Sequence, residues 1–327
     1  MTLYGAAVLL VVFGALLAAL DLLLLALTPW LLRSLIPSAP DRRSDAILII
    51  RSAPVLAAAA VAALVFLPAW WTHEPENTGE TASALLLGLA LLSALPLLQG
   101  LFRGARMFVR TRDRLLIWRG RGRNPPRVEA PYEVLEVTSG DLALCVGGYL
   151  RPTIYASAEV IRSLDPEEFN AALAHEVSHA ARRDPLRLLW LGSCPDFLRL
   201  FGLDRPWRLA FSRACEFAAD AGASRGNPEV ALDLASALLK VARLRTFRPL
   251  TAEVLADVAV SSAFSSRADL EARVEALANP RPEPTPAAFG PRPWMFAAAL
   301  LLLCAAGALA SEHVHTLTEE VGRFLSR

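Results

Sequence analysis

Runs of apolar residues divide this chain into membrane-like and polar parts. The first run, residues 3–32, is broken only by Asp21, and three more runs cover residues 47–71, 81–102 and 294–310. A helix needs about 20 apolar residues to cross ~30 Å of hydrocarbon; the first three runs exceed that length, and the fourth is shorter but almost purely apolar. The pattern predicts a mainly α membrane protein with four transmembrane helices, three before a large polar segment and one after it.

Asp21 is a carboxylate inside the first apolar run. Such a group is either a functional intramembrane residue or one whose charge is capped. The second interpretation is favoured, with the carboxylate capped inside the helix bundle or near its cytoplasmic end.

Arginine placement predicts the orientation of the helices. The loop after the first run contains Arg33, Arg42 and Arg43, whereas residues 72–80 contain three glutamates and neither Lys nor Arg. Five more arginines follow the third run within residues 103–114. Because loops rich in Lys and Arg stay in the cytoplasm, the polar segment is expected inside, and the N-terminus and a short tail, 311–327, are expected outside. The expected location is the plasma membrane.

The polar segment predicts an α+β domain over residues 132–279. A basic linker, 103–131, precedes it, and a Pro-rich linker, 280–293, connects it to the last apolar run. Alternating apolar residues around glycine turns predict a small antiparallel sheet. Its strands are expected at residues 132–138, 142–146 and 149–155.

Helix-start signals mark the rest of this domain. Asp165-Pro166-Glu167-Glu168 combines an N-cap residue, a proline at the first position and a glutamate at the third. Residues 186–203 are apolar in places but contain charges and Pro195, so a buried or membrane-grazing helix is favoured over a span. Further helices are expected at residues 207–224, 228–243 and 266–278, the last of them as part of the core.

The helix that starts at Asp165 leads into His175-Glu176-Val177-Ser178-His179. Two histidines four residues apart on a helix point from one face, so both imidazoles can bind one metal ion. In this HExxH pattern the glutamate stays off the metal and acts as general base on water. His175 and His179 are therefore candidate zinc ligands and Glu176 is the candidate catalytic base. The alternative, a solvated helix with a chance repeat, is disfavoured.

A catalytic zinc site also needs a third protein ligand and one open position. Glu216 and Asp220 lie four apart amid apolar residues of a later predicted helix, where carboxylates without partners are costly. Glu216 is the preferred third ligand, with Asp220 accepting a hydrogen bond from a ligand histidine. Two alternatives stay open: the two carboxylates are surface charges paired with arginines such as Arg213, or Asp184 is the ligand, although Pro185 suggests that Asp184 simply ends a helix.

Composition argues against several other kinds of function. The net charge of +1 implies no bulk attraction to nucleic acid. The four cysteines are scattered without a CxxC pair, which argues against a disulfide framework and against a cysteine-ligated zinc site.

Two segments, HEVSHAARRD from His175 and SRACEFAAD from Ser212, resemble the gluzincin membrane metallopeptidases, whose pattern is HExxH and then ExxxD on a later helix. The resemblance implies a gluzincin-like domain with one Zn²⁺ per chain. The ion would be bound by His175, His179 and Glu216, with Glu176 as catalytic base and Asp220 hydrogen-bonded to a ligand.

The layout of three spans before the motif and one after it is similar to the BlaR/MecR type, whereas the HtpX type usually has two spans before the motif. BlaR/MecR sensors continue into an extracellular penicillin-binding domain, but only the short tail 311–327 follows the last expected span here. The chain is therefore expected to lack that sensor and to receive its signal from a partner, the membrane or the short outer loops.

The sequence thus predicts a membrane-embedded zinc endopeptidase that cleaves a cytoplasmic protein, by resemblance a repressor or the chain itself. The expected partners are this substrate, the lipid bilayer and a separate sensor or repressor protein, with no direct contact to nucleic acid. We expect the substrate to pair as an extra strand with residues 142–155, and Arg213 and Tyr155 are candidate oxyanion donors.

Two other functions are compatible with the same motif. An HtpX-like quality-control protease would use the same chemistry on broad substrates. A catalytically inactive signalling or scaffold protein is disfavoured because a structural zinc needs no base such as Glu176.

Overall fold

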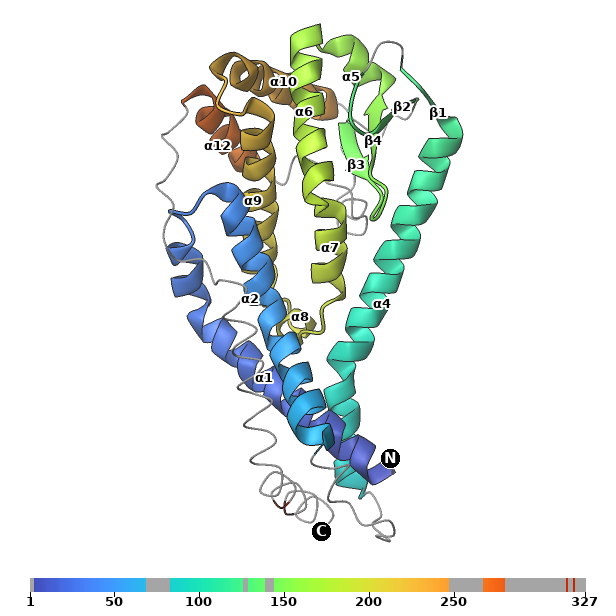
Figure 1. Cartoon of the computed structure of the whole chain (residues 1–327), viewed down its shortest axis with the longest axis vertical. Helices are drawn as coiled ribbons and strands as arrows, with labels where there is room; N and C mark the ends of the chain where they lie inside the picture. The colour runs from blue at the N-terminus through green and yellow to red at the C-terminus, as the bar shows by residue number, and fades with distance from the viewer. Residues whose placement is uncertain are drawn as a thin grey trace.

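Three long helices form the tapered end of the molecule (Figure 1). The computed structural model describes residues 3–68, 83–125, 129–138, 144–246 and 267–279, with Thr316 and Glu320. The long helices are α1 (Leu3–Ser34), α2 (Pro40–Val61), which continues as a π-helical turn η1 (Ala62–Phe66), and α4 (Ala84–Arg121). Each is long and apolar enough to cross a membrane, as predicted for the first three runs. The fourth expected span, 294–310, and the Pro-rich linker, 280–293, lie outside the described residues.

The expected basic linker begins as a helix. Residues 103–121 continue α4 without a break, and a short strand, β1 (Gly122–Arg123), follows. Arginine is a good helix former, and no proline occurs between Pro96 and Pro125, so nothing in the local sequence ends the helix earlier. The third span and the polar domain are therefore connected by one rigid element.

A four-stranded sheet lies beside α4, in the order β1-β2-β4-β3. The remaining strands are β2 (Glu133–Val137), β3 (Leu144–Gly147) and β4 (Thr153–Ser157). The prediction of an antiparallel sheet was wrong, because β2 and β4 pair in parallel with Glu133 opposite Thr153, while β3 and β4 are antiparallel. Gly148, at φ +97°, lets the chain turn back after β3, so β4 inserts between β2 and β3. This insertion leaves β3 at one edge of the sheet.

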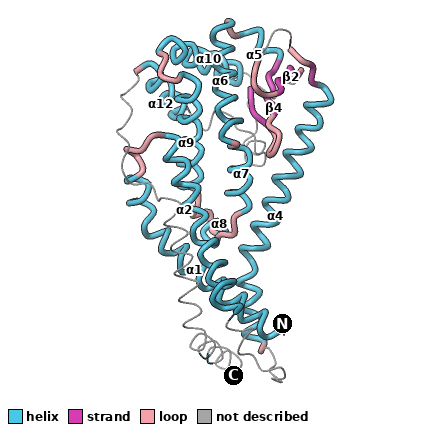
Figure 2. The backbone as a smooth tube through the Cα atoms, in the orientation of Figure 1, coloured by secondary structure: helices cyan, strands magenta, loops and turns pink. Residues whose placement is uncertain are grey.

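Helices make up the rest of the described polar domain, as Figure 2 shows. The start of α6 confirms the helix signal: Asp165 and Glu168 form a capping box, and Pro166 opens the helix. The expected single helix over 186–203 is instead two helices, because the chain is extended at Asp196. The helices are α5 (Ala158–Ser163), α6 (Pro166–Arg182), α7 (Asp184–Ser193), α8 (Phe197–Leu200), α9 (Arg205–Ser224), α10 (Pro228–Thr246) and α12 (Arg267–Ala278).

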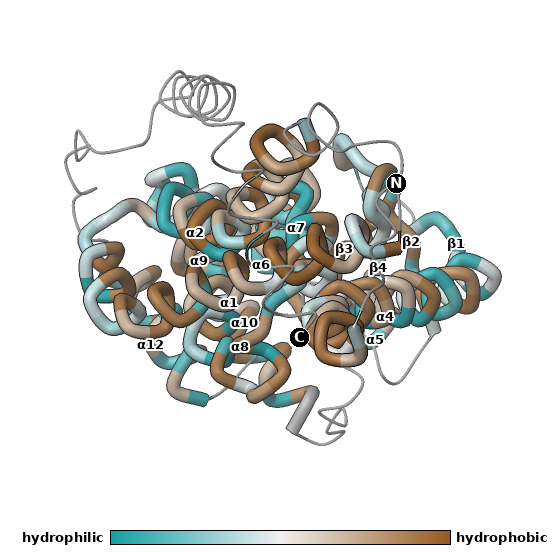
Figure 3. Tube along the Cα trace, turned by 90° about the horizontal axis from the view of Figure 1, so that it is seen from below, coloured by the Kyte–Doolittle hydropathy of each residue, from teal (hydrophilic) through white to brown (hydrophobic). Residues whose placement is uncertain are grey.

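Two apolar clusters place α6 and α9. Phe169 and Leu173 of α6 pack on one face of the sheet through Val146 and Ile154, so α6 is fixed against the strands. Helix α9 packs on the opposite side of α6, and its buried aromatic residues also pack against α1 and α2. Seen along the long axis, α6 and α7 lie between α2 and α4 (Figure 3). The membrane-type helices and the polar domain therefore share one packed interior.

Candidate metal centre

Helix α6 buries the two histidines and the glutamate of the HExxH motif. His175 and Glu176 are each 3% exposed and His179 is 1% exposed. The apolar side of α6 is held by the sheet, so the motif side faces α9. Charged and imidazole side chains buried to this degree require partners, and the partners come from three other helices.

Helix α9 comes close enough to α6 to supply the third ligand. A Cβ atom at Gly222 would lie 2.7 Å from the Ser178 hydroxyl on α6, a separation too short for any larger residue without movement. The close approach brings Glu216, 8% exposed, opposite the two histidines. The sequence alternative that Glu216 and Asp220 are surface charges was wrong: both are buried, and Arg213 pairs with Asp269 instead.

The three candidate ligands meet with the spacing of a tetrahedral site. The His175 and His179 Nε2 atoms are 3.1 Å apart. Glu216 Oε2 lies 3.6 Å from His175 Nε2, and Glu216 Oε1 lies 3.7 Å from His179 Nε2. Ligands about 2.0–2.1 Å from one Zn²⁺ ion are separated by about 3.3 Å in a tetrahedron. The buried group His175, His179 and Glu216 can therefore hold a metal ion.

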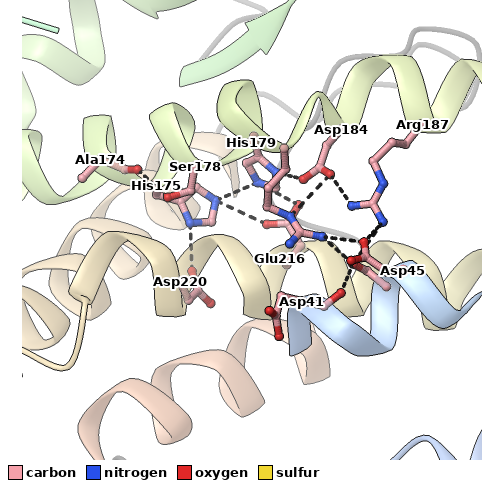
Figure 4. A network of polar contacts seen from close by, with 12 residues as sticks. Asp41, Asp45, Ala174, His175, Ser178, His179, Asp184, Arg187, Glu216 and Asp220 are labelled. Atoms are coloured by element: carbon pink, nitrogen blue, oxygen red, sulfur yellow. Dashed lines mark hydrogen bonds and ion pairs between the residues drawn. The ribbon is translucent and has the colours of Figure 1, made fainter. Parts of the chain in front are cut away.

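A carboxylate lies next to the Nδ1 atom of each imidazole (Figure 4). His175 Nδ1 lies 2.9 Å from Asp220 Oδ1, and His179 Nδ1 lies 2.7 Å from Asp184 Oδ2. With a proton on each Nδ1, both Nε2 lone pairs point at one another, an arrangement that a cation between them would stabilise. The placement of Asp220 agrees with the sequence prediction.

Asp184 has a different place from the one the sequence suggested. Arg183 adopts a left-handed conformation at φ 54°, which ends α6 and turns the chain so that Asp184 becomes the first residue of α7. Its carboxylate then lies against His179 Nδ1, outside the group formed by His175, His179 and Glu216, and Asp184 begins a helix rather than simply ending one. Arg187 donates to Asp184 Oδ1 at 3.1 Å and also pairs with Asp45 of α2. This polar chain, visible in Figure 4, joins the candidate metal centre to a membrane-type helix.

Arg273 of α12 is a site residue that the sequence reasoning missed. Arg273 is 1% exposed, and its guanidinium contacts Asp220 at 2.6 and 2.7 Å and Glu216 Oε2 at 2.8 Å. The sequence analysis assigned this helix, residues 266–278, to the core, and Leu270 and Val274 do pack against a buried apolar cluster. A signal was present, because Arg273 lies on the same helical stripe, and a basic residue on a buried stripe needs an acidic partner.

Burial and neighbouring charges strongly shift the pKa values of the candidate ligands His175 and Glu216. Burial lowers the pKa of His175, but its contacts with Asp220 and Glu216 outweigh burial and raise that pKa to about 9. Burial would raise the pKa of Glu216, yet Arg273 and the two histidines hold it well below its ordinary range. Without a metal, His175 therefore holds an extra proton at neutral pH, and a divalent cation would have to displace that proton in order to bind.

Charge-pair effects also keep the supporting carboxylates ionised. Burial raises the pKa of Asp184, but His179 and the nearby arginines lower it further than burial raises it. Arg273 has the corresponding effect on Asp220. Burial lowers the pKa of Arg273, but the carboxylates of Asp220, Glu216 and Glu176 raise it above its usual value, which places Glu176 within electrostatic reach of the same guanidinium.

The two candidate oxyanion donors lie elsewhere in the described structure. Tyr155 packs against Trp118, at 5.4 Å between ring centroids, in an apolar cluster that contains no residue of α6. The Arg213 guanidinium is paired with Asp269 of α12. The geometry therefore supports neither assignment.

Comparison of the chain with protein-family models, with curated proteins and with solved structures finds no match.

Proposed function

We propose that this chain is a zinc-dependent membrane endopeptidase. The observation that carries the proposal is the convergence of two Nε2 atoms and one carboxylate at 3.1–3.7 Å, beside a buried glutamate one residue after the first histidine. A structural zinc site needs no such glutamate, whereas a hydrolytic site needs a general base. A zinc ion bound there would polarise the scissile carbonyl and lower the pKa of a coordinated water to about 7.

The residues of the chain divide the remaining work. Glu176 accepts the proton of the attacking water and delivers it to the leaving amine. Asp220 and Asp184 keep the His175 and His179 rings in the tautomer that directs both Nε2 atoms to the metal. Arg273 neutralises the carboxylates gathered in the buried centre and holds Glu216 in position.

The edge of the sheet offers a place for the substrate. β3 forms one edge of the described sheet, and it packs next to α6. An extended polypeptide that adds to β3 would run alongside the HExxH helix, with backbone hydrogen bonds supplying affinity without sequence preference. By resemblance to the BlaR/MecR type, the substrate would be a cytoplasmic repressor or the chain itself.

The proposal includes a topology. Three apolar helices fit a membrane protein. We place a fourth span at residues 294–310 and the candidate site in the cytoplasm, because arginines concentrate on that side of the apolar runs. A plasma-membrane location completes this topology.

The test combines zinc content with cleavage of casein, or of the chain itself, in membranes. Wild type should bind about one zinc per chain and cleave; Glu176→Gln should keep zinc and lose cleavage; Glu216→Ala should lose zinc. Glu167→Gln, an exposed change on the same helix, is the matched control and should behave as wild type. Zinc in a wild type that never cleaves would favour the scaffold function, and absence of zinc would refute the metal centre.

A further inference from the structure

The helices that carry the site extend away from the sheet and form a hairpin with a pointed tip. Helix α7 continues from the end of α6, α9 returns to Glu216, and the short α8 lies at the turn (Figure 1). The tip, residues 194–204, lies among α1, α2 and α4, and α8 packs against α1. We define these residues and their flanking turns of α7 and α9 as the hairpin tip.

Three charged residues of the long helices hold the hairpin tip. Asp21 of α1 accepts a hydrogen bond from the Phe197 backbone N–H at 2.9 Å. Arg103 of α4 donates to the carbonyl oxygens of Gly192 and Cys194, both at 3.0 Å. Backbone groups that leave regular structure away from water need such partners, and membrane proteins supply them from neighbouring helices. Asp21 is therefore a capped carboxylate, as the sequence favoured.

Arg51 of α2 holds the same turn through its side chain. It forms an ion pair with Asp196, the extended residue between α7 and α8 that caps the start of α8. The side chains of the two partners are 9% and 4% exposed, so the pair is shielded from water. One acidic and two basic residues on three different helices thus meet at a single level of the bundle.

The distance of that level from the far ends of the long helices matches the thickness of a hydrocarbon core. On each long helix, an apolar stretch separates the charged residue from the far end of the helix: Leu3 to Asp21, Phe66 back to Arg51, and Ala84 to Arg103. At about 1.5 Å per residue these stretches span roughly 27, 23 and 28 Å, against ~30 Å for the apolar core of a bilayer. In a bilayer crossed by α1, α2 and α4, the hairpin tip would therefore lie at the boundary of the leaflet nearer the candidate metal centre.

The outer surface of the hairpin tip is apolar at the same level. Phe201 is 75% exposed, Leu203 is 44% exposed and Trp190 is 47% exposed. The neighbouring turns of α1 and α4 also expose leucines and Phe102, so the apolar surface is continuous with the helices that fit a membrane. Basic residues follow at the start of α9, as expected where a chain leaves the acyl region for the headgroups.

We infer that the hairpin tip inserts into the inner leaflet and binds lipid through Phe201, Leu203 and Trp190. The inference rests on α1, α2 and α4 crossing the bilayer, as the proposed function requires. The metal centre and the hairpin tip lie at opposite ends of α7, which begins at Asp184 and has 10 residues. On α9, the segment from Arg205 to Glu216 has a similar length. At about 1.5 Å per residue, the candidate metal centre lies ~15 Å from the tip. Peptide bonds would then be cleaved close to the membrane surface.

The experiment measures depth and needs no enzymatic activity, so its outcome is independent of the peptidase test. A nitroxide is attached at Phe201→Cys in reconstituted vesicles, with the four native cysteines replaced by alanine. Collision rates with oxygen, which concentrates in lipid, and with a neutral nickel chelate, which stays in water, are compared by power saturation. Leu203→Cys is a second test position if Phe201→Cys fails to fold. Leu232→Cys on α10, 55% exposed in the wild type, is the matched control.

The expected result is an oxygen-to-nickel collision ratio several-fold higher at Phe201→Cys than at Leu232→Cys. Nickel accessibility at Phe201→Cys equal to that at Leu232→Cys would overturn the inference, because the hairpin tip would then lie in water. Protection of Phe201→Cys from both reagents would also overturn it, because the tip would then be covered by protein rather than by lipid.

Discussion

Asp184→Asn is the sharpest test of how the candidate metal centre is held together. The wild-type carboxylate is fully buried and accepts from His179 Nδ1 at 2.7 Å and from Arg187 at 3.1 Å. Asparagine has nearly the same volume, so packing should be preserved. Its carbonyl can still accept from His179, but its amide group would then point N–H donors at the arginine. His179 should therefore keep only a weaker, neutral acceptor and lose the negative charge that makes its Nε2 a stronger ligand.

The magnitude follows from the role of such partners in metal sites. Loss of a carboxylate that hydrogen-bonds a ligand histidine weakens metal binding by ~10–100-fold. That loss corresponds to about 1.4–2.7 kcal/mol of binding free energy. Zinc affinity measured by competition with a chromophoric chelator resolves a change of this size.

Asp45→Asn is the matched control for this measurement. Asp45 pairs with the same Arg187, but its side chain is 62% exposed, and exposed pairs contribute about 0–1 kcal/mol. Its zinc affinity should therefore stay close to that of wild type. Two results would refute the reasoning: an Asp184→Asn variant that binds zinc like the control, or one that loses zinc entirely as expected for Glu216→Ala, which would make Asp184 a ligand.

The charges and packing of the site lead to four further predictions. Because the pKa of His175 is raised to about 9 from 6.5, zinc binding at pH 7.5 should release about one proton, seen in calorimetry as a dependence of the heat on buffer ionisation enthalpy. The raised pKa of His175 also stabilises the metal-free fold, and this stabilisation is complete below pH 6.5 and is lost as the pH rises through 9. Chelator-treated protein should therefore unfold at a lower temperature at pH 9.5 than at pH 6.5, and equal unfolding temperatures would contradict this prediction. Arg273→Met leaves two buried carboxylates without their counter-charge, which should destabilise the metal-free protein by ~3–5 kcal/mol and make added zinc raise its unfolding temperature more than that of wild type. A Cβ atom at Gly222 would lie 2.7 Å from the Ser178 hydroxyl, which can rotate away, but also 3.2 Å from the Ser178 Cβ, which cannot, so Gly222→Ala should push α6 and α9 apart at a cost of ~1–3 kcal/mol and weaken zinc binding. Gly88→Ala, with open space around it, should leave the zinc affinity unchanged, and identical affinities for the two variants would refute the close-approach argument.

Local signals in the sequence were sufficient for most of the helices and for part of the site. Apolar run length identified the three helices that fit a membrane, because spanning depends on consecutive residues alone. The spacing of His175 and His179 and of Glu216 and Asp220 placed each pair on one helical face, because side-chain direction repeats about every 3.6 residues. The capping box at Asp165 marked the start of α6 for the same reason: its hydrogen bonds join residues three apart.

Tertiary structure decided what depends on contacts between distant residues. β4 lies between β2 and β3, and no alternation of residues along one strand reveals its neighbour, so the sheet is mixed rather than antiparallel. Arg273 reaches Asp220 across 53 positions of sequence, and Asp184 reaches His179 only because Arg183 turns the chain sharply. Asp21, Arg51 and Arg103 meet at the hairpin tip from three helices. The sequence by itself determined which side chains could bind a metal and which helices could span a membrane, because both depend on spacing within one element. Packing between elements determined that Asp184 lies against His179 and that Arg273 neutralises Glu216 and Asp220, because those contacts join different helices.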